Sequence, residues 1–564
     1  MDYSRICEIY EELEATRSGL EKTEILAGFL REIRGNPEFI YLLRGNIFPD
    51  YDSREFGISH QLVIKGIARA AGILETEVVE KFKEFGDLGL VAEFFLGGKK
   101  KQKGLFEAKL SVEKVLENLR KLTTIGGSGT VDLKIGYIVD LLHSASAVEA
   151  RYVVRTVLSD LKIGVGVGML RDAVAVYCFA PKDLEDKKIC VQAVQEAYDK
   201  STDFAEVFEK ACLDELEKIK MVAGKPLKVM LFPKAKNVED AFRIVGRLAA
   251  FEYKYDGFRV MVNRSEDGEV KIFTRALENV TEQFPDIVEA VRENVSGKSF
   301  ILDCEAVGFD SSTGKYTDFQ AISQRIRRKH GIAEMMSKLP VELVVFDVVF
   351  LDGDSLIDVK FEKRRKLIER IVRVEEKRIV LARQIVTSDE KEVERFYEEA
   401  LDDNQEGLMG RRLDSPYKPG ARIGYAVKLK PEDADFDLVI TGAEWGTGKR
   451  AGWLTSFDIS CRGEDGELLG IGKVSTGLKE IEGEGVTFKE MTDMLEKIVV
   501  RVDGRHVEVK PEIVVSVRFQ DVQKSPTNSS GFALRFPRIL KLRPDRNVSD
   551  IASLEEIEAE VSEK

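Results

Sequence analysis

The residue best suited to covalent chemistry is Lys254, in the run Phe251-Glu252-Tyr253-Lys254-Tyr255-Asp256-Gly257-Phe258-Arg259. A lysine attacks a phosphorus atom only as the free amine. Bringing a side chain of pKa ~10.4 to neutrality at pH 7 costs about 4.6 kcal/mol. An enclosed site with nearby cations lowers this cost, because it destabilises the ammonium form. The lysine-x-aspartate-glycine pattern is short, so it predicts such a nucleophile only if other motifs accompany it.

Other motifs do accompany it. Lys254-Tyr255-Asp256-Gly257 resembles the nucleophile motif of covalent nucleotidyltransferases, and above all that of the ATP-dependent DNA ligases. The remaining motifs of that family follow in the expected order, at residues 273–275, 302–306, 345–348, 406–409, 425–430, and 535–538 with 543–546. The resemblance extends over nearly the whole chain, and archaeal ligases fit it best.

The resemblance implies a role for the residues on the nucleotide side. Lys254 would attack the α-phosphate of ATP, forming a phosphoramidate with AMP and releasing pyrophosphate. Glu252 would accept a hydrogen bond from the adenine amino group, which a guanine carbonyl could not donate. Phe346 would stack on the base.

The resemblance also implies how phosphates and a metal would be held. Four cations would bind the ribose and the phosphates and would offset the charge that builds up in the transition state: Arg259, Arg275, Arg422 and Lys428. Glu305 and Glu406 would bind Mg²⁺, a hard cation that prefers carboxylates and keeps several waters. When the C-terminal domain closes, the pyrophosphate would be oriented by Arg543, Asp545 and Arg546. Such closure needs a hinge, expected near Lys430-Pro431.

Several of these residues also allow a purely structural interpretation. Glu305 and Glu406 could be ordinary carboxylates at strand ends, and Phe346 could belong to the hydrophobic core. Asp256 is expected to support a turn and not to react. Cys304 precedes Glu305 in a predicted strand, so it should point to the opposite face and into the core.

The fourth motif departs from the family pattern. It ends in Gly410-Arg411, where an aliphatic residue and a lysine are usual. Because arginine is a planar fork and not a point donor, the usual lysine's role is not assigned to Arg411. A milder departure is Arg546, which stands where lysine is common.

The N-terminal part, residues 1–224, is predicted to be helical. Apolar residues recur every three or four positions, for example in 112–121 and 148–161. A glycine-rich run at 161–168 interrupts this pattern and could either seat a phosphate at a helix N-terminus or form a tight turn. By resemblance this part is an all-α DNA-binding domain.

Two domains of different character follow. Residues 225–430 show an α+β pattern, with β-rich runs at 258–262, 270–274, 300–302 and 343–350. Residues 431–564 carry closely spaced strands, typical of a small β-barrel, at 436–441, 455–461, 498–502 and 513–519. An acidic helix is expected after residue 549. By resemblance these are an adenylation (nucleotidyltransferase) domain and an OB-fold domain.

Composition excludes several classes of protein. The 564 residues include no apolar run of membrane-spanning length, and the start lacks a secretory pattern. Six scattered cysteines without a CxxC pair argue against a disulfide framework or a zinc ribbon, so a cytoplasmic location is expected. The net charge of −13 leaves nucleic-acid binding open, because phosphate recognition needs only a local basic face.

The expected partners are nicked double-stranded DNA and a sliding clamp, and the protein is expected to act as a monomer. DNA would be held mostly through phosphates, without reading sequence. The run Gln102-Lys103-Gly104-Leu105-Phe106 resembles the clamp-docking motif of archaeal ligases, with Gln102, Leu105 and Phe106 as its docking residues. The basic runs 99–103 and 325–329, taken alone, are more simply interpreted as solvated surface.

The predicted function is therefore an ATP-dependent DNA ligase that serves DNA replication, repair and recombination. An RNA ligase or a capping-type nucleotidyltransferase would use the same lysine chemistry, but would lack so large a helical domain. A catalytically degenerate DNA-binding scaffold is disfavoured by the intact Lys254, Glu305 and Lys428. An NAD-dependent ligase is disfavoured because no cysteine zinc site follows the predicted barrel.

Overall fold

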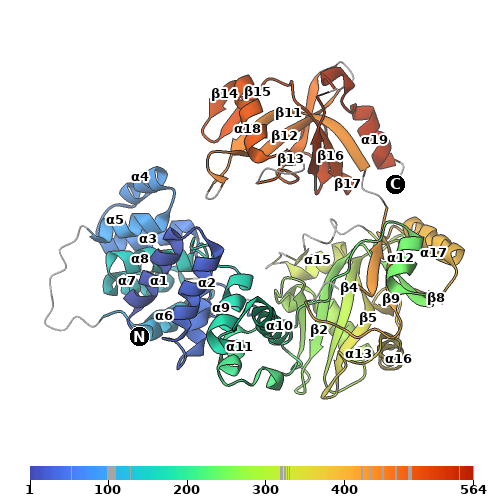
Figure 1. Ribbon diagram of the computed structural model, residues 1–564, viewed down its shortest axis with the longest axis horizontal. Helices are drawn as coiled ribbons and strands as arrows, with labels where there is room; N and C mark the ends of the chain where they lie inside the picture. Colours follow the sequence, from blue (N-terminus) through green and yellow to red (C-terminus); the bar gives the residue numbers. More distant parts are fainter. Residues whose placement is uncertain are drawn as a thin grey trace. The chain divides into compact units, whose positions relative to one another are not determined.

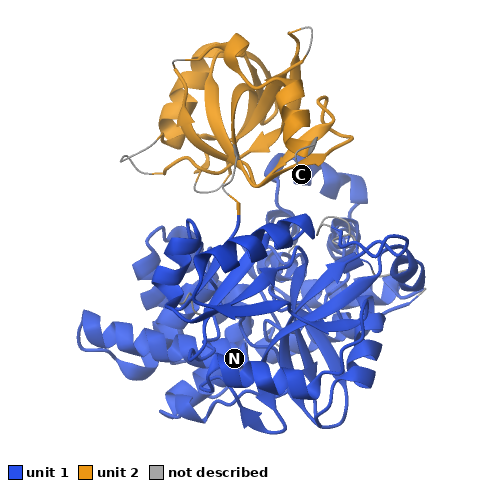
Figure 2. Cartoon of the chain, turned by 90° about the vertical axis from the view of Figure 1, so that its right-hand side faces the viewer, with its two compact units in different colours: residues 1–430 blue, residues 431–564 orange. Residues whose placement is uncertain are grey.

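The computed structural model describes the chain in two compact units, Met1–Lys430 and Pro431–Lys564 (Figure 1 and Figure 2). The residues it describes are 1–562 without 53, 98–108, 128, 318–321, 323–324, 327, 329–330, 421–423, 432–433, 448–449, 464–465, 481–485 and 545. Each unit is described by itself below. Among the helices that were described, none is long and apolar enough to cross a membrane.

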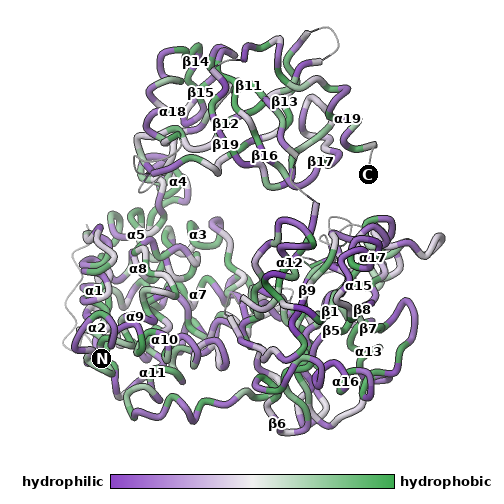
Figure 3. Tube along the Cα trace, turned by 45° about the vertical axis from the view of Figure 1, so that its right-hand side comes forward, coloured by the Kyte–Doolittle hydropathy of each residue, from purple (hydrophilic) through white to green (hydrophobic). Residues whose placement is uncertain are grey.

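The N-terminal part of the first unit is helical, as predicted. Its elements are α1 (Tyr3–Ala15), α2 (Gly19–Leu30), η1 (Pro37–Arg44), α3 (His60–Ala71), α4 (Glu75–Phe85), α5 (Leu88–Gly97), α6 (Val112–Thr124), α7 (Val131–Ser144), α8 (Ala147–Val157), α9 (Val167–Phe179), α10 (Leu184–Ser201) and α11 (Phe204–Cys212). They share one core of buried aliphatic and aromatic side chains. Hydrophobic residues are spread over the helices and strands of both units and are not gathered in one segment (Figure 3).

Local sequence explains several helix ends and one close helix contact. Ser146 and Glu149 form a capping box that begins α8, which satisfies two otherwise unpaired backbone donors. A Cβ at Gly89 would lie 2.8 Å from the carbonyl oxygen of Arg151, so only glycine allows α5 to pack this closely on α8. The glycine-rich run leads into α9 at Val167, with Gly166 as the N-cap. Before it, Lys22 Nζ donates to the Ile163 carbonyl at 2.5 Å.

Two sheets, one antiparallel and one mainly antiparallel, form the second part of this unit. A four-stranded sheet has the order β10-β9-β1-β8, from β1 (Ala249–Lys254), β8 (Gln384–Thr387), β9 (Gly407–Arg412) and β10 (Ala426–Leu429). A six-stranded sheet has the order β3-β2-β4-β5-β6 with β7 parallel to β5, from β2 (Phe258–Arg264), β3 (Val270–Thr274), β4 (Phe300–Gly308), β5 (Val341–Leu351), β6 (Asp354–Ser355) and β7 (Ile379–Leu381). The predicted strands of this α+β part are confirmed.

Helices cover the outer face of each sheet, and the inner faces meet. Residues of α13 (Pro285–Asn294) and α16 (Phe361–Ile371) share a core with β2, β4 and β5, and Cys304 lies in this core as predicted. Residues of α12 (Val238–Val245) and α17 (Glu390–Asp402) share a core with β1, β9 and β10. Between the sheets, Met261 and Ile301 pack in one cluster with Ala426 and Met409. Polar residues on these inner faces therefore lie opposite one another.

The second unit is rich in strands and carries two helices, α18 (Phe488–Leu495) and α19 (Leu554–Ser562). Its main sheet has the order β13-β12-β11-β15-β14, with β16 on β11 and β19 on β16. The strands are β11 (Ala434–Trp445), β12 (Leu454–Arg462), β13 (Leu468–Val474), β14 (Val499–Asp503), β15 (His506–Val509), β16 (Val514–Phe519) and β19 (Arg538–Leu542), with a separate pair β17 (Asp521–Lys524) and β18 (Phe532–Arg535). Within the described part of this unit no strand pair closes the sheet, so a strand-rich domain is shown, and the barrel stays a prediction.

Candidate active site

The register of the four-stranded sheet places Glu252 and Lys254 on its inner face. They are two positions apart on β1, and side chains two apart on a strand share a face. Glu252 lies opposite Gln384 of β8 and Met409 of β9, and Met409 in turn lies opposite Lys428 of β10. Four strands thus bring residues from distant parts of the sequence into one row.

Lys254 forms an ion pair with Glu406. Its Nζ lies 2.7 Å from Glu406 Oε2, and each side chain is 21% exposed. The backbone fixes this pair, because Glu406 N donates to the Lys254 carbonyl at 2.8 Å. Glu406 directly precedes β9, and Gly407 packs so closely on β10 that a Cβ would lie 2.3 Å from the Leu429 carbonyl. The candidate nucleophile and one candidate metal ligand therefore lie together.

The turn after Lys254 also depends on a glycine. A Cβ at Gly257 would lie 2.4 Å from the carbonyl oxygen of Ala306 on β4, which leaves no space for any side chain. The backbone N–H of Asp256 donates to Gln405 Oε1 at 3.0 Å. The backbone of Asp256 is thus held within the turn, and the role of its side chain stays a prediction. The close approach to Ala306 gives a physical reason for the glycine in the motif.

Glu305 supplies a second carboxylate from the opposite sheet. It lies on β4, paired with Arg259 of β2, and is partly buried. The pKa of Glu305 is raised to about 8, mainly by burial and also by the negative charges of Glu406 and Asp303, although Lys254 and Arg259 act in the opposite direction. The carboxylates of Glu305 and Glu406 thus influence each other across Lys254. Uncompensated negative charge of this kind suits a cation.

The donor set at this point fits Mg²⁺. Two carboxylates leave room for the waters and phosphate oxygens that this ion retains. Across the described residues, no group of three or more histidine, cysteine, aspartate or glutamate side chains could hold a metal by itself. Glu305 and Glu406 would therefore share any Mg²⁺ with solvent and with a phosphate ligand.

Arg259 is held by the protein itself. Its Nε and Nη2 contact Asp303 Oδ1 and Oδ2 at 2.8 and 2.5 Å, and Nη1 donates to the Met230 carbonyl at 2.7 Å. Asp303 also accepts a hydrogen bond from Tyr417 at 2.7 Å. These contacts occupy three of the five N–H donors of the guanidinium and fix its direction. Among the described residues, no hydrogen bond uses the other two donors.

Phe346 lies on a β-bulge. Asp303 pairs with Asp347 and Cys304 pairs with Val345, so Phe346 is the extra residue on β5. A bulge re-aims the side chain that it carries. The ring is partly buried, and the guanidinium groups of Arg259 and Arg411 lie 5.5 and 5.2 Å from its centroid. Phe346 therefore has two guanidinium groups near its ring and is only partly buried, whereas a core residue would be surrounded by apolar side chains.

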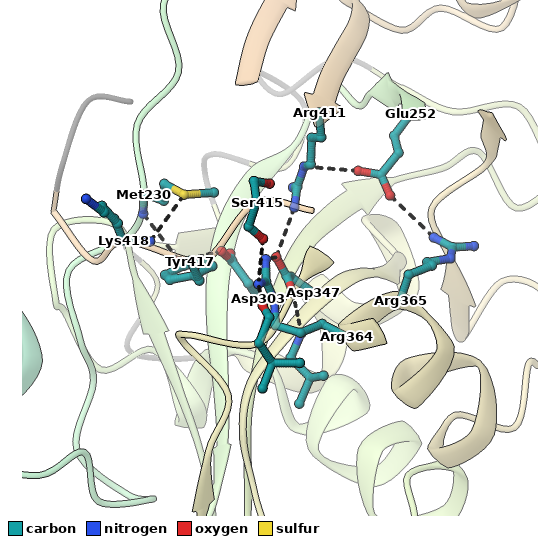
Figure 4. A network of polar contacts seen from close by, with 12 residues as sticks. Met230, Glu252, Asp303, Asp347, Arg364, Arg365, Arg411, Ser415, Tyr417 and Lys418 are labelled. Atoms are coloured by element: carbon teal, nitrogen blue, oxygen red, sulfur yellow. Dashed lines mark hydrogen bonds and ion pairs between the residues drawn. The ribbon is translucent and has the colours of Figure 1, made fainter. Parts of the chain in front are cut away.

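A buried charged network that the sequence did not reveal joins Glu252, Arg411, Asp347 and Arg364 (Figure 4). Arg411 is 3% exposed, with Nε 3.2 Å from Glu252 Oε2 and Nη1 3.0 Å from Asp347 Oδ2. Arg364 of α16 contacts the same Asp347 at 2.7 and 3.0 Å. These two arginines lower the pKa of Asp347 although burial alone would raise it. The replacement of a usual lysine by Arg411 was the one signal in the sequence.

Other predicted residues lie further out or outside the described part of the chain. Lys428 is half-buried on β10 beside Met409, and Arg275 follows β3 with an exposed side chain. Arg543 and Arg546 belong to the second unit, where both approach Asp437, at 2.5 and 3.7 Å. The following predicted residues fall outside the described residues: Arg422, Asp545, Gln102, Leu105 and Phe106.

The interpretation of the basic run 325–329 as solvated surface is wrong for Arg325. This guanidinium is fully buried, paired with Asp286 and bonded to the carbonyls of Gln283 and Leu339 at 3.0 and 3.1 Å. Its neighbour Arg328 is exposed as expected. Arg325 therefore has a structural role, because its guanidinium joins its own segment to Gln283, Asp286 and Leu339.

Comparisons with known proteins show which proteins this chain resembles. Family models described as "DNA ligase N terminus", "ATP dependent DNA ligase domain" and "ATP dependent DNA ligase C terminal region" match residues 2–175, 229–430 and 450–546. The chain is 41% identical over 564 residues to a DNA ligase of Nanoarchaeum equitans, covering 99% of this chain and 98% of that protein. It is 40% identical over 563 residues to a DNA ligase of Thermococcus fumicolans, with 99% and 98% covered. A solved structure called Pmar-Lig_PreS3 shares the fold, with TM-score 0.56 at 18% identity over 95% of this chain and 99% of that one.

Proposed function

Since the chain belongs to the family of ATP-dependent DNA ligases, we propose that it seals nicks between 3′-hydroxyl and 5′-phosphate ends of duplex DNA through a lysyl-AMP intermediate on Lys254. The observation that carries this assignment of the lysine is its place between two carboxylates from two different sheets. Lys254 Nζ attacks the α-phosphorus of ATP, a P–N bond forms, and the bond to pyrophosphate breaks.

The acidic pair holds the lysine and would hold the metal. Glu406 holds the lysine in place, with Oε2 2.7 Å from Lys254 Nζ. Mg²⁺ bound by Glu305 and Glu406 would supply positive charge beside the phosphates and offset that of the two carboxylates. The neutral amine of Lys254 attacks the phosphorus, and the proton that its nitrogen loses as the P–N bond forms passes to solvent.

The base and the phosphates are bound on either side of the lysine. Glu252 accepts a hydrogen bond from the adenine amino group, and Phe346 stacks on the ring. Ribose, phosphates and developing charge are held by Arg259, Arg275, Arg422 and Lys428. The fixed direction of Arg259, with two donors that no hydrogen bond among the described residues uses, supports this assignment.

Three domains divide the work: residues 1–224 bind DNA, 225–430 carry adenylation, and 431–564 form an OB-fold barrel. Arg543, Asp545 and Arg546 of the barrel orient the pyrophosphate. Asp437 already gathers two of these side chains in one place, which supports a common role. A hinge at Lys430-Pro431 lets the barrel leave the nucleotide and turn another face to DNA. The strand-rich second unit beginning at Pro431 is compatible with this motion.

The protein acts as a monomer in the cytoplasm, in DNA replication, repair and recombination. It encloses the nicked duplex mainly through phosphate contacts. A sliding clamp recruits it through Gln102, Leu105 and Phe106, where a glutamine precedes an apolar and aromatic plug. Phe106→Ala should remove stimulation by the clamp while leaving sealing without the clamp unchanged. Undiminished stimulation would disprove the docking role.

A pulse and chase tests the main proposal. The protein is incubated with α-labelled ATP and Mg²⁺, and then chased with duplex DNA carrying one nick. The label should survive denaturation and be discharged only when the nick bears a 5′-phosphate. Discharge only by nicked RNA would point to an RNA ligase, and transfer to a 5′-diphosphate RNA end to a capping-type enzyme. Absence of any label would indicate a degenerate DNA-binding scaffold.

A further inference from the structure

We propose that Arg411 positions Glu252 to read the nucleotide base, and that it thereby sets the preference for adenine, which carries an amino group at C6 where guanine carries a carbonyl oxygen. This inference rests on the proposed function, because it takes Glu252 as the base-reading residue. It assigns a role to a buried side chain on β9 that contacts both the carboxylate and the ring of Phe346.

Glu252 has one satisfied oxygen and one open oxygen. Oε1 accepts from Gln384 Nε2 at 2.9 Å and lies 3.4 Å from Arg365 Nη1. Oε2 is buried and lies 3.2 Å from Arg411 Nε, but no hydrogen bond reaches it from the described structure. Buried carboxylate oxygens are almost always hydrogen-bonded, so an open one indicates a missing donor. An exocyclic amino group supplies such a donor.

Asp347 holds the guanidinium of Arg411 in place. Arg411 Nη1 contacts Asp347 Oδ2 at 3.0 Å, and Asp347 is fixed by Arg364 and by the backbone N–H of Val348 at 2.9 Å. The guanidinium thus spans two buried carboxylates, with Asp347 anchoring one end and Glu252 held by the other. A planar fork can do this in two directions, whereas a lysine ammonium is a single point.

The charge of Arg411 also decides what Glu252 can recognise. Burial raises the pKa of Glu252, and the positive charges of Arg411 and Arg365 lower it. An ionised carboxylate only accepts hydrogen bonds, so it pairs with an adenine amino group and repels a guanine carbonyl oxygen. A protonated carboxyl can donate to that oxygen and loses the distinction. The pKa of Glu252 is raised overall, and the positive charge of Arg411 acts against this rise and so favours the ionised form that accepts from adenine.

The test compares label transfer from α-labelled ATP and α-labelled GTP, each titrated to obtain kcat and KM. Wild type should prefer ATP, and in Arg411→Met that preference should fall by about tenfold or more, the loss expected when a polar recognition group is disturbed. The KM for ATP should rise more than kcat falls, because Arg411 does not touch the reacting atoms. A fall confined to kcat, with the preference intact, would overturn the inference.

Arg412→Met is the matched control. Arg412 is the neighbour on β9, is 48% exposed, and pairs with exposed Asp414. Its loss should leave the ATP preference unchanged. An equal drop in both methionine variants would mean that the selectivity of Arg411→Met reflects general damage to β9, and would overturn the inference.

Two further variants separate positioning from folding. Arg411→Lys keeps one charge but cannot span both carboxylates, so the preference should fall by roughly threefold or more, and an unchanged preference would count against the inference even if Arg411→Met does not fold. In a Glu252→Gln background, adding Arg411→Met should change the preference little, because both changes act through one carboxylate. A further large drop there would contradict the inference. Wild type that takes no label from ATP would instead refute the proposed function itself.

Discussion

Two nearby positions on strand β1 (Ala249–Lys254) hold charge in opposite ways: Lys254, called here the reactive end, and Glu252, called the base-reading end. Around Lys254, one cation faces the carboxylates of Glu406 and Glu305, and the pair with Glu406 remains partly exposed. Two residues earlier, Glu252 is buried and enclosed by Arg411, Arg365 and Gln384. At the first end, nearby cations offset only part of the cost of ionising Glu305, whereas at the second end two arginines lie beside the carboxylate. A cation bound near Lys254 would therefore be stabilised by Glu305 and Glu406, whereas the contacts around Glu252 restrict the movement of its side chain.

The pKa directions express the same contrast. Burial raises the pKa of Glu305 to about 8, because nearby cations offset only part of the cost of burying its charge. The pKa of Asp347 is lowered despite complete burial, because Arg364 and Arg411 bind it directly. Two arginines thus compensate the buried charge of Asp347. Lys254, which also pairs with Glu406, compensates the charge of Glu305 only in part.

The largest expected effect is on chemistry at the reactive end. Lys254→Ala should reduce nucleotidyl transfer by about 10⁴-fold or more, since no other group can replace the attacking amine. The free energy of unfolding should change by only about 0–1 kcal/mol, because the lost ion pair is partly exposed. Label incorporation and urea unfolding measure the two effects. Residual transfer within about a hundredfold of wild type would assign the nucleophile elsewhere.

The next effect is on stability at the base-reading end. Arg364→Met removes one partner of a buried pair and should lower the free energy of unfolding by about 3–5 kcal/mol, because Asp347 keeps its charge without full compensation. Chemical denaturation of the full chain measures it. Replacing Asp347 by asparagine in the same chain should recover part of the loss. A cost below about 1 kcal/mol would mean that the network contributes little and that the contrast between the two ends is false.

A smaller effect of opposite sign is expected at Glu305. In the absence of Mg²⁺ and nucleotide, Glu305→Gln should raise the free energy of unfolding by about 1–2 kcal/mol at pH 8 and abolish most label transfer. The raised pKa means that the folded wild type keeps a proton that the unfolded chain releases, so wild-type stability falls as the pH rises from 4.5 to about 8. The advantage of the variant should grow over that window and stay constant above it. A variant less stable than wild type at pH 8 would contradict the finding that nearby cations compensate the charge of Glu305 only in part.

The smallest effect should come from an exposed pair formed by Arg412, which lies on β9 next to Arg411. Arg412→Ala removes a contact of 2.6 Å with Asp414, both side chains being about half exposed. The free energy of unfolding should change by about 0–0.5 kcal/mol, since such pairs are solvated and screened. Thermal unfolding beside Arg364→Met gives the comparison directly. A loss as large as that of Arg364→Met would remove burial as the cause of the difference.

Much of this arrangement could be predicted from local sequence, and the reasons are physical. Alternation on a strand correctly placed Cys304 in the core and Glu305 away from it. The strands of the α+β part follow from short apolar runs between turns. Local patterns suffice wherever the position of a side chain depends on its own strand.

The rest depends on contacts between segments far apart in the chain. Arg411 meets Glu252 only because β9 pairs with β1, and the bulge that re-aims Phe346 follows from the register of β5 against β4. Arg325 is buried through partners in α13 and after α15, which a run of basic residues does not reveal. Such features require the register of whole sheets and the packing of distant helices.

The central claim is that the amine of Lys254 carries the nucleotide, held beside an acidic pair from two sheets. Peptide mapping of the protein after reaction with ATP and Mg²⁺ tests it most directly. The account predicts AMP on Lys254, gained with ATP and lost after addition of a nick with a 5′-phosphate. AMP on any other residue, or an adduct on Lys254 that the nick does not discharge, would contradict it.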